Sequence, residues 1–299
     1  MKVHLYDVRW IDETFIEFQA SFENTRFAKK RIKIGDNLSL QVQEEISCAG
    51  FVRDGVWKPC LDAVIGRKKC ERCRAREGRF IYTSFDGFNT DNFTVQDLAK
   101  LEGEHIVYLS LFNKELIKIG VSRIERKTLR QLEQGSHFTL FIAKTSNGTL
   151  ARQIETLFRR AGIADKIRAS KKKDFFCPDI TKEEGQKILE SLFEKHKGVL
   201  NEYTNLQNFL LPSPEFSFWE NIYGTEQVSQ NPKSFHTVKL EKNEGISGKV
   251  IAKKGAFLAL ELPEELVSIG LKDLVGHQIE FDEQPEGLYL NSAFQSALF

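Results

Sequence analysis

The sequence has no apolar run that approaches the length of a membrane-spanning helix. Its first residues, MKVHLYDVRWIDE, contain no uninterrupted apolar segment of the kind that a signal peptide needs. We therefore expect a cytoplasmic protein that does not have a membrane as its partner. The sequence also has no repeat with a solenoid period, so a stacked-repeat architecture is not expected.

An overall excess of charge is absent too, because 43 lysine and arginine residues stand against 42 acidic residues in a chain of 299. Hydrophobic residues make up 41% of the chain and charged residues 28%, which is typical of a soluble globular protein and not of a disordered one. The length allows one large domain or two to three ordinary ones.

The near-zero total charge hides two segments of opposite sign. Residues 118–173 carry a net charge of +10, whereas residues 201–299 carry a net charge of −7. A local basic excess attracts phosphates and speeds the encounter with nucleic acid, so we expect DNA or RNA as the partner. A solvated helical face that needs no partner is the alternative interpretation.

Cysteine is scarce, with five residues, but four of them lie close together in the sequence. SCAGFVRDGVWKPC contains Cys48 and Cys60, and RKKCERCR contains Cys70 and Cys73. Four thiolates satisfy a tetrahedral Zn²⁺ with no open position, so the pattern predicts a structural zinc knuckle over residues 48–73. Disulfides would suit a secreted protein, and a redox CxxC would suit a βαβ context, which is absent here.

The second cysteine pair is surrounded by basic residues. Seven lysine and arginine residues lie between positions 67 and 79. A small metal-stapled knuckle with this much positive charge suits the phosphate backbone of a nucleic acid.

We expect an α+β protein with three regions along the chain. Residues 1–95 alternate apolar and polar positions, as in KVHLYDVRW and TFIEFQASF, and predict a β-rich region that includes the zinc knuckle. Residues 96–200 form a central domain. Residues 201–299 form an acidic β-rich region with turn-forming glycines, and LPSPEFSFW near its start resembles a boundary.

The central domain has the predicted order β-β-α-β-α, followed by a further helix, which suits a small α/β layer. Gly135 is expected to cap the first helix, and Thr181 with Glu184 to form a capping box at the start of the last. The predicted elements are strands 105–111 and 116–121, helix 124–134, strand 138–145, helix 149–162 and helix 181–198.

Polar residues recur at helical spacing in this domain. Arg126, Arg130 and Gln134 follow one another at intervals of one turn, so they share a face of the first predicted helix. On the next long helix, Glu155 flanks an apolar stripe and has arginines within one turn, Arg152 among them. Glu155 is therefore either a salt-bridge partner of these arginines or an oxygen ligand of a divalent cation.

Phosphodiester hydrolysis needs a cation or guanidinium to absorb developing charge, together with an activated water. Tyr108 on the first strand, Arg130 and Glu155 supply these parts if the fold brings them together. A surface salt-bridge network without chemistry is the competing interpretation. His105 is a candidate general base because imidazole titrates near pH 7, and a purely structural role is its alternative.

Three short motifs carry a resemblance to known families, namely HIVYLS at 105–110, KIGVSR at 118–123 and LRQLEQGS at 129–136. The segment 105–160 resembles the GIY-YIG nuclease superfamily, whose core has two motif-bearing strands, an arginine-bearing helix, a third strand and a helix with a metal-binding glutamate. The motifs are more similar to those of the prokaryotic domain-of-unknown-function family 2797, with its zinc-bearing N-terminal part and its H-x-V-Y-L-A and K-I/V-G-I/V-S/T-R motifs. This resemblance extends over most of the chain.

The resemblance implies roles for individual residues. Tyr108 would orient or deprotonate the attacking water, and Arg130, or else Arg126, would contact the scissile phosphate. Glu155 would bind one Mg²⁺ or Mn²⁺. Further contacts with nucleic acid are expected from Arg123, Arg126, Gln134, Arg152, Lys171 and Lys172.

Two positions depart from the superfamily pattern. Ile106 replaces its first glycine, and Lys118 replaces the tyrosine of its second motif. Lys118 can contact phosphate, but it is not a phenolic proton carrier, and at its ordinary pKa it stays charged. These departures argue against hydrolysis more strongly than they argue against nucleic-acid binding.

The sequence therefore predicts a nucleic-acid-binding protein, with a metal-dependent phosphodiesterase of the endonuclease type as the first hypothesis. Tyr108, Arg130 and Glu155 favour this hydrolase. Lys118 and the lost glycine favour the second hypothesis, a non-catalytic module for RNA or DNA binding with a degenerate nuclease fold. The third is an RNA-modifying enzyme that uses the sheet pocket for a small molecule.

Overall fold

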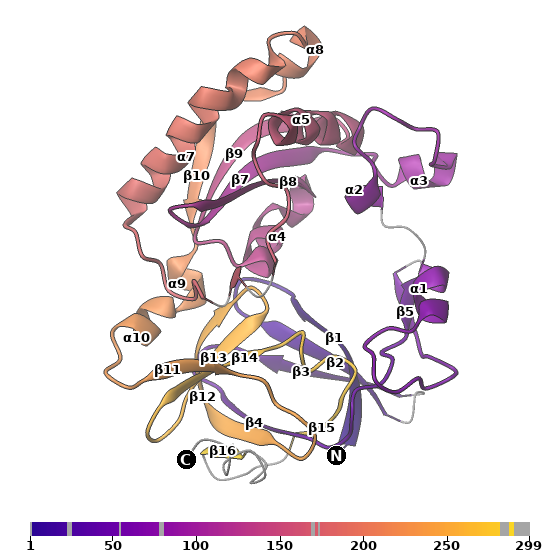
Figure 1. Ribbon diagram of the computed structural model, residues 1–299, viewed down its shortest axis with the longest axis vertical. Helices are drawn as coiled ribbons and strands as arrows, with labels where there is room; N and C mark the ends of the chain where they lie inside the picture. The colour runs from indigo at the N-terminus through magenta and orange to yellow at the C-terminus, as the bar shows by residue number, and fades with distance from the viewer. Residues whose placement is uncertain are drawn as a thin grey trace. The chain divides into compact units, whose positions relative to one another are not determined.

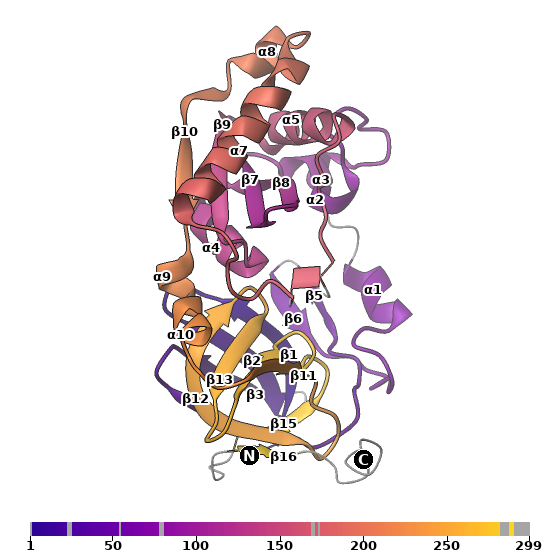
Figure 2. The ribbon, with the colours of Figure 1, turned by 60° about the vertical axis from the view of Figure 1, so that its left-hand side comes forward.

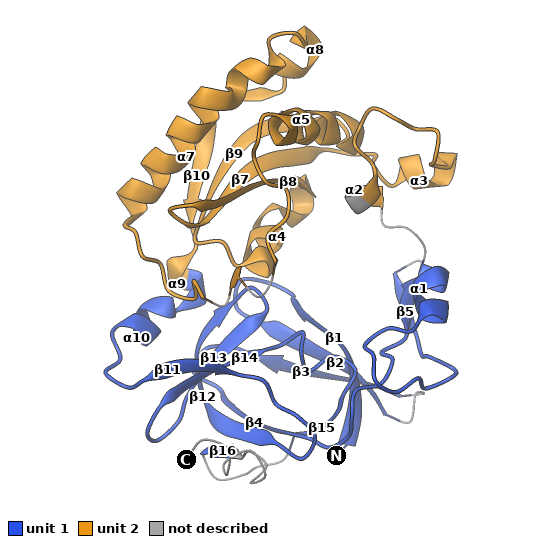
Figure 3. Ribbon diagram, in the orientation of Figure 1, with its two compact units in different colours: residues 1–78, 222–299 blue, residues 79–221 orange. Residues whose placement is uncertain are grey.

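The computed structural model describes residues 2–22, 26–53, 55–77, 81–168, 171–172, 174–281 and 287–289. The chain divides into two compact units, which have different colours in Figure 3. Unit 1 consists of residues 1–78 and 222–299, and unit 2 consists of residues 79–221. Strands and helices occur in both units, which confirms the predicted α+β class.

Unit 1 is built on one large sheet to which both ends of the chain contribute (Figure 1). Its strands are β1 (Lys2–Trp10), β2 (Ile16–Phe22), β3 (Arg26–Ile32), β4 (Asn37–Val42), β11 (Phe235–Val238), β12 (Gly245–Lys254), β13 (Phe257–Glu261), β14 (Leu266–Gly270), β15 (Gln278–Glu280) and β16 (Gly287–Tyr289). Their order is β11-β14-β13-β12-β4-β15-β1-β2-β3, with β16 paired to β12. Strands from the first and the last of the expected regions therefore interleave in a single sheet.

Alternating hydrophobicity places these strands against their core. In β4, Leu38, Leu40 and Val42 are fully buried, while the residues between them are partly or wholly exposed. In β1 the same alternation is interrupted by the register shift between Leu5 and Asp7 and resumes at Val8. The period of two matches the alternation of side chains across a pleated strand, as the sequence pattern predicted.

Unit 1 also contains smaller elements, and some of them lie around the cysteines. β5 (Phe51–Arg53) and β6 (Val56–Lys58) form a two-stranded hairpin, and α1 (Glu71–Glu77) follows in the sequence. α10 (Thr225–Ser229) packs against β12 on another part of the sheet. α9 (Glu220–Tyr223) spans the point in the sequence where unit 2 ends.

Unit 2 is built on a four-stranded sheet in the order β10-β9-β7-β8. Its strands are β7 (His105–Asn113), β8 (Leu116–Arg123), β9 (Phe138–Thr145) and β10 (Leu210–Phe218), and its helices are α2 (Ile81–Ser84), α3 (Val95–Ala99), α4 (Lys127–Gln134), α5 (Gly148–Arg160), α7 (Lys182–His196) and α8 (Thr204–Gln207), with 3₁₀ turns at Ile124–Arg126 and Lys197–Leu200. The element order from β7 to α7 is the predicted one. None of the helices in the described part of the chain is long and apolar enough to cross a membrane.

The segment LPSPEFSFW, expected as a boundary, supplies the edge strand β10, which pairs with β9, and unit 2 ends shortly after it at residue 221. Pro212 and Pro214 lie where the pairing register shifts, between Leu210 and Glu215. Proline cannot donate to a sheet ladder, so it is tolerated at edges and bulges, and the two prolines concealed this strand in the sequence pattern.

The two faces of the unit 2 sheet carry different residues. Val107 and Leu109 of β7 belong to an apolar core shared with α5 and α7, and α7 lies over β9 (Figure 2). The intervening Tyr108 and Ser110 point to the opposite face, where the Ser110 hydroxyl donates to the Gln131 side chain of α4 at 2.8 Å. As predicted, Gly135 ends α4 in the left-handed conformation, and the capping box at Thr181 and Glu184 starts α7.

Candidate functional site

Four predicted site residues lie around one concavity of unit 2. Tyr108 of β7, Lys118 of β8, Arg130 of α4 and Glu155 of α5 all line a cavity of about 230 Å³, which we call the central pocket. Gln134 and Arg152 line it as well. The spatial convergence that the hypothesis required is therefore present, although the roles of these residues stay predictions.

The pairing of β7 with β8 places the tyrosine and the lysine on the same face. Tyr108 pairs with Gly120, and Ser110 pairs with Lys118. A Cβ atom on residue 120 would lie 2.6 Å from the Tyr108 hydroxyl oxygen, so the phenol ring needs glycine beneath it. The glycine of the KIG motif thus has a packing reason, which is to let the phenol lie flat across β8 into the pocket.

Tyr108 is fully buried, and its pKa reflects this. Burial raises the pKa of the phenol above its ordinary value, although the positive charge of Arg130 acts in the opposite direction. The phenol therefore stays protonated at neutral pH. It can donate a hydrogen bond to a water or a phosphate oxygen, but it is poorly suited to remove a proton.

Lys118 is only 6% exposed. Burial, followed by the charge of Arg130, lowers the pKa of its ammonium group to about 8. The segment after α5 closes this side of the pocket, because the Ile119 amide donates to the Ala164 carbonyl at 2.8 Å. That contact brings Asp165 and the residues after it along the free edge of β8.

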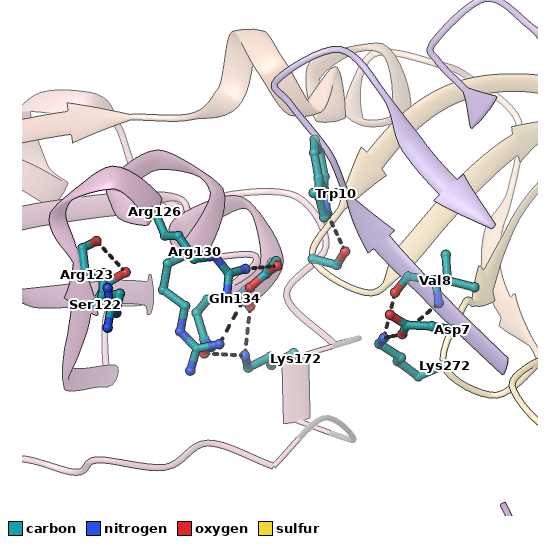
Figure 4. A network of polar contacts seen from close by, with 12 residues as sticks. Asp7, Val8, Trp10, Ser122, Arg123, Arg126, Arg130, Gln134, Lys172 and Lys272 are labelled. Carbon is teal, nitrogen blue, oxygen red and sulfur yellow. Dashed lines mark hydrogen bonds and ion pairs between the residues drawn. The ribbon is translucent and has the colours of Figure 1, made fainter. Parts of the chain in front are cut away.

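A group of basic side chains lies on and beside α4 (Figure 4). Lys172 donates to the Gln134 carbonyl at 2.7 Å, and its ammonium lies 4.8 Å from the centroid of the Phe112 ring. Burial, followed by the charges of Lys118 and Arg130, lowers the pKa of Lys172 to about 7. The charge of Arg130 therefore acts against the charged forms of both lysines, and a bound anion would offset this repulsion.

The two arginines predicted to contact phosphate lie in different elements, because Arg126 ends the 3₁₀ turn before α4 and Arg130 lies within α4. Arg126 donates to Glu133 at 2.6 Å and does not line the central pocket, whereas Arg130 lines it and lies 3.7 Å from the same carboxylate. Of the other predicted nucleic-acid contacts, Arg123 donates to the Lys100 carbonyl at 2.8 Å, outside the pocket. Lys171 is exposed.

Glu155 forms a salt bridge with Arg152, three residues earlier on α5. The Nε of Arg152 in turn donates to the Phe85 carbonyl at 2.8 Å. Both side chains of the pair are buried, and burial raises the pKa of Glu155, although the charge of Arg152 opposes this. Within the described residues, no group of three or more acidic, histidine or cysteine side chains gathers at Glu155.

His105 is not among the residues that line the central pocket. It lies three positions before Tyr108 on β7, so its side chain points to the other face of the sheet. Its ring is fully buried, with Nδ1 2.8 Å from the Gly103 carbonyl and the ring packed against Gly148 of α5. Burial lowers its pKa. This placement is that of a structural histidine, the alternative to the predicted general base.

The four clustered cysteines meet in unit 1. Their sulfur atoms all lie within 4.8 Å of one another, and those of Cys60 and Cys70 are 3.8 Å apart. A tetrahedron with Zn–S bonds of about 2.3 Å needs sulfurs about 3.8 Å apart, whereas a disulfide needs about 2.05 Å. All four are buried, and the Cys70 amide donates to the Cys48 sulfur. The donor set therefore fits a closed structural metal site.

Gly50 allows this cluster to form. Its φ of +78° is in the left-handed region, and a Cβ atom there would lie 2.1 Å from the Lys58 carbonyl oxygen. No other residue lets the chain after Cys48 pass so close to the chain that leads into Cys60.

Five residues that line the pocket were not predicted from the sequence, and Gly120, Asp165 and Lys166 are among them. Gly120 stood in a quoted motif, and its packing role was readable only once Tyr108 was known to face it. Asp165 and Lys166 follow α5 in a loop, and no local pattern marked them.

These two sites belong to a chain of a recognised family. A model of the family described as protein of unknown function (DUF2797) matches residues 35–279. The chain belongs to this family, as the motif resemblance predicted, and the matched range includes both the cysteine cluster and the central pocket. Neither the curated proteins nor the solved structures contain a match to the chain.

Proposed function

We propose that this protein is a nucleic-acid phosphodiesterase of the GIY-YIG type and that its reaction takes place in the central pocket. One observation carries the proposal: Tyr108, Lys118, Arg130 and Glu155 come from four separate elements and line the same concavity. Recognition of a phosphate needs converging cations, and hydrolysis needs a proton carrier beside them. The pocket contains both kinds of group.

The cations supply the binding of the phosphodiester. Arg130 presents a guanidinium that can hold two phosphate oxygens at once. The charge of Arg130 acts to lower the pKa of Lys172, so a bound phosphate would stabilise the charged forms of Arg130 and Lys172 together. This arrangement selects for anions and against neutral ligands.

Lys118 carries the proton in this proposal. With a pKa of about 8, a useful fraction of the amine is neutral near pH 7 and accepts a proton as the water oxygen attacks phosphorus. The bond from phosphorus to the leaving oxygen breaks, and that oxygen takes a proton from solvent. Tyr108, with its raised pKa, orients the water by a hydrogen bond instead of deprotonating it.

Two metals belong to the proposal. Zn²⁺ held by Cys48, Cys60, Cys70 and Cys73 has a structural role. Mg²⁺ or Mn²⁺ at Glu155 would neutralise charge on the phosphate, with water and phosphate oxygens completing its shell. Glu155 offers one carboxylate oxygen for this purpose while the other stays on Arg152.

The test compares Arg130 of α4 with Arg126, which ends the 3₁₀ turn before it. Purified protein is incubated with labelled single- and double-stranded DNA and RNA, with Mg²⁺ or Mn²⁺ and then with EDTA. We expect Arg130→Ala to lower the cleavage rate about 100- to 1,000-fold, as for loss of one donor to a developing charge. Arg126→Ala is the matched control, because it lies one turn earlier and contacts the same Glu133, yet does not line the pocket.

Equal losses in the two arginine variants would show that the effect arises from disturbing Glu133 and not from the pocket. The absence of any cleavage by the wild-type protein, with every polymer and metal, would refute the phosphodiesterase proposal.

The second candidate is a binding module that does not cut. The Arg152–Glu155 salt bridge favours it, because an arginine already occupies the carboxylate that would hold the metal. Glu155→Gln separates the two candidates while keeping the side-chain shape. A module would retain salt-dependent binding in wild type and variant with no product in either, whereas a metal-dependent enzyme would lose cleavage in the variant.

A further inference from the structure

We propose that the outer face of β1, β2 and β3 in unit 1 binds the unpaired bases of a single-stranded nucleic acid. This inference rests on the proposed function, since it takes nucleic acid as the partner and narrows it to strands whose bases are free to stack. It concerns residues that neither the motifs nor the central pocket include.

An aromatic cluster lies on this face. The rings of Tyr6 and Trp57 are stacked, with centroids 4.2 Å apart and planes 19° from parallel. Phe27 meets both rings edge-on, at 6.3 Å and 5.7 Å. The Trp57 indole N–H donates to the Ala49 carbonyl at 2.7 Å, which fixes the orientation of the ring. The cluster is therefore a rigid platform.

Phe27 is the exposed part of this platform. It is 61% exposed, an unusual position for a phenylalanine on a strand. β3 is the last strand of the sheet, and Phe27 pairs with Ser21 of β2, which pairs in turn with His4 of β1. The register thus turns the phenylalanine outward, beside Tyr6, which lies where the pairing of β1 with β2 shifts.

Three cations on the same face surround one buried carboxylate. Glu17 of β2 has a side chain only 2% exposed, and Arg9, Lys29 and Arg31 approach it at 3.9, 3.5 and 3.2 Å. Their own side chains are 50, 55 and 60% exposed. Gln19 also donates to Glu17 at 2.7 Å. One acid thus orients three cations, and their group keeps a net charge of +2.

Burial acts to raise the pKa of Glu17, but hydrogen bonds from Gln19 and Arg31 and the charge of Lys29 outweigh it and lower the pKa. The carboxylate therefore stays ionised at neutral pH and holds the cations in place. Cations that are already positioned lose less side-chain freedom when a phosphate binds.

Charge and shape together identify the occupant. An exposed aromatic ring beside positioned cations matches a polymer that has flat bases and an anionic backbone. A duplex hides its base faces, and an acidic peptide offers nothing flat to stack on the ring. A single strand satisfies both the ring and the cations.

The test uses the full-length chain and fluorescent oligonucleotides of equal length, as single strands and as duplexes. We expect Phe27→Ala to weaken single-strand binding about ten-fold or more while duplex binding changes by less than about two-fold. Phe27→Tyr keeps the ring and should bind like wild type. Phe27→Leu keeps an apolar side chain without the ring and should behave like Phe27→Ala.

A second variant tests the cations. Lys29→Ala should weaken single-strand binding and lower the slope of log affinity against log salt by about 0.7. Lys249→Ala removes an exposed lysine from β12 of the same sheet and should leave that slope unchanged. The inference would be overturned if Phe27→Ala bound single strands as tightly as wild type, or if Phe27→Leu and Phe27→Tyr bound equally well. The face would then have another partner, such as a protein strand that pairs with the edge of β3.

These outcomes are independent of cleavage in the central pocket. Wild-type protein that never cleaves, but whose single-strand binding depends on Phe27, would refute the phosphodiesterase and support this face. Cleavage lost in Arg130→Ala, together with unchanged binding in Phe27→Ala, would support the phosphodiesterase and refute this face.

Discussion

Each of the two basic regions of the molecule contains a buried charged group, and its surroundings stabilise the charged form in one region and destabilise it in the other. On the outer face of unit 1, a buried carboxylate, Glu17, is satisfied by three cations and an amide, and its pKa is lowered. In the central pocket of unit 2 the buried charge is a cation, Lys118, and its nearest charged neighbours include the further cation Arg130. Its pKa is lowered as well, to about 8.

The same direction of shift has opposite meanings for the two groups. A lowered pKa stabilises the charged form of an acid and destabilises the charged form of an amine. Glu17 therefore contributes to the stability of the fold, whereas Lys118 lowers that stability in exchange for reactivity near neutral pH. Unfavourable charge of this kind is a signature of functional sites.

Metal removal should have the largest effect on stability, and this effect should be seen in unit 1 and not in unit 2. Because structural zinc contributes directly to folding free energy, Cys70→Ser should lower the zinc content from about one per chain towards zero and destabilise the hairpin and α1 by several kcal/mol. Hydrogen exchange should show lost protection around Cys48–Cys73 and retained protection in β7–β9. Cys177→Ser, outside the cluster, is the control and should keep its zinc.

Wild-type protein that contains no zinc and keeps its stability in the presence of a chelator would contradict this prediction. A Cys70→Ser protein as stable as wild type would contradict it too.

Lys118→Met should have opposite effects on activity and stability. Cleavage should fall about 100-fold or more through loss of the proton carrier. The unfolded chain, with an amine pKa of 10.5, binds more protons than the folded chain between pH 8 and 10.5, so stability rises with pH across this window. Removing the amine should therefore raise the free energy of unfolding at pH 7 by about 1–3 kcal/mol.

Chemical denaturation at pH 7 and pH 10.5 measures the stability change, and the gain should disappear at the higher pH. A destabilised Lys118→Met protein would show that the amine is satisfied in the fold and that the comparison with Glu17 is wrong.

Glu17→Gln should destabilise the protein by about 1–2 kcal/mol, because the partner cations are half-exposed and remain hydrated. Since the pKa of Glu17 is lowered in the fold, its contribution is present above the unfolded pKa and is lost as the pH falls through the folded pKa. Denaturation at pH 7 should reveal the loss, and denaturation at acid pH should not. Equal losses at both pH values would indicate a packing role instead.

The pH dependence of binding should show the smallest effect and should distinguish the two regions. Lys172 and Lys118 lose their charges around pH 7 and pH 8, so affinity for an oligonucleotide that depends on the central pocket should fall about ten-fold from pH 6 to pH 9. Lys172→Met should flatten this curve. The outer face contains neither Lys118 nor Lys172, so its contribution should change little.

Fluorescence titration at constant ionic strength measures both contributions. A pH-independent affinity in wild-type protein would show that neither lysine contacts the bound strand.

Local patterns predicted much of unit 2. Alternation and helical periodicity located β7, β8, α4, β9 and α5, because each of these elements buries one face within a short stretch of sequence. The capping box at Thr181 and the glycine cap at Gly135 were readable for the same reason. The strand β10 was missed because its two prolines resemble a boundary.

The candidate site was only partly predictable. The positions of Tyr108, Lys118, Arg130 and Glu155 came from spacing and motif resemblance. Their convergence depends on the register of β7 with β8 and on the packing of α5, which no local pattern contains. The salt bridge of Arg152 with Glu155 was predicted as one of two alternatives. That the side chain of His105 points to the sheet face opposite Tyr108 could be learned only from the structure of the sheet.

By itself the sequence determined the cysteine quartet, the order of the elements in the central domain and the membership of the family, since each of these depends on residue types at short, fixed spacings. Tertiary structure alone decided that both ends of the chain share one sheet and that Tyr6, Phe27 and Trp57 form one cluster. It also decided that Lys118 has a pKa of about 8. Strand pairing over long distances and burial from water cause these properties, and neither is encoded in the neighbours of a residue along the chain.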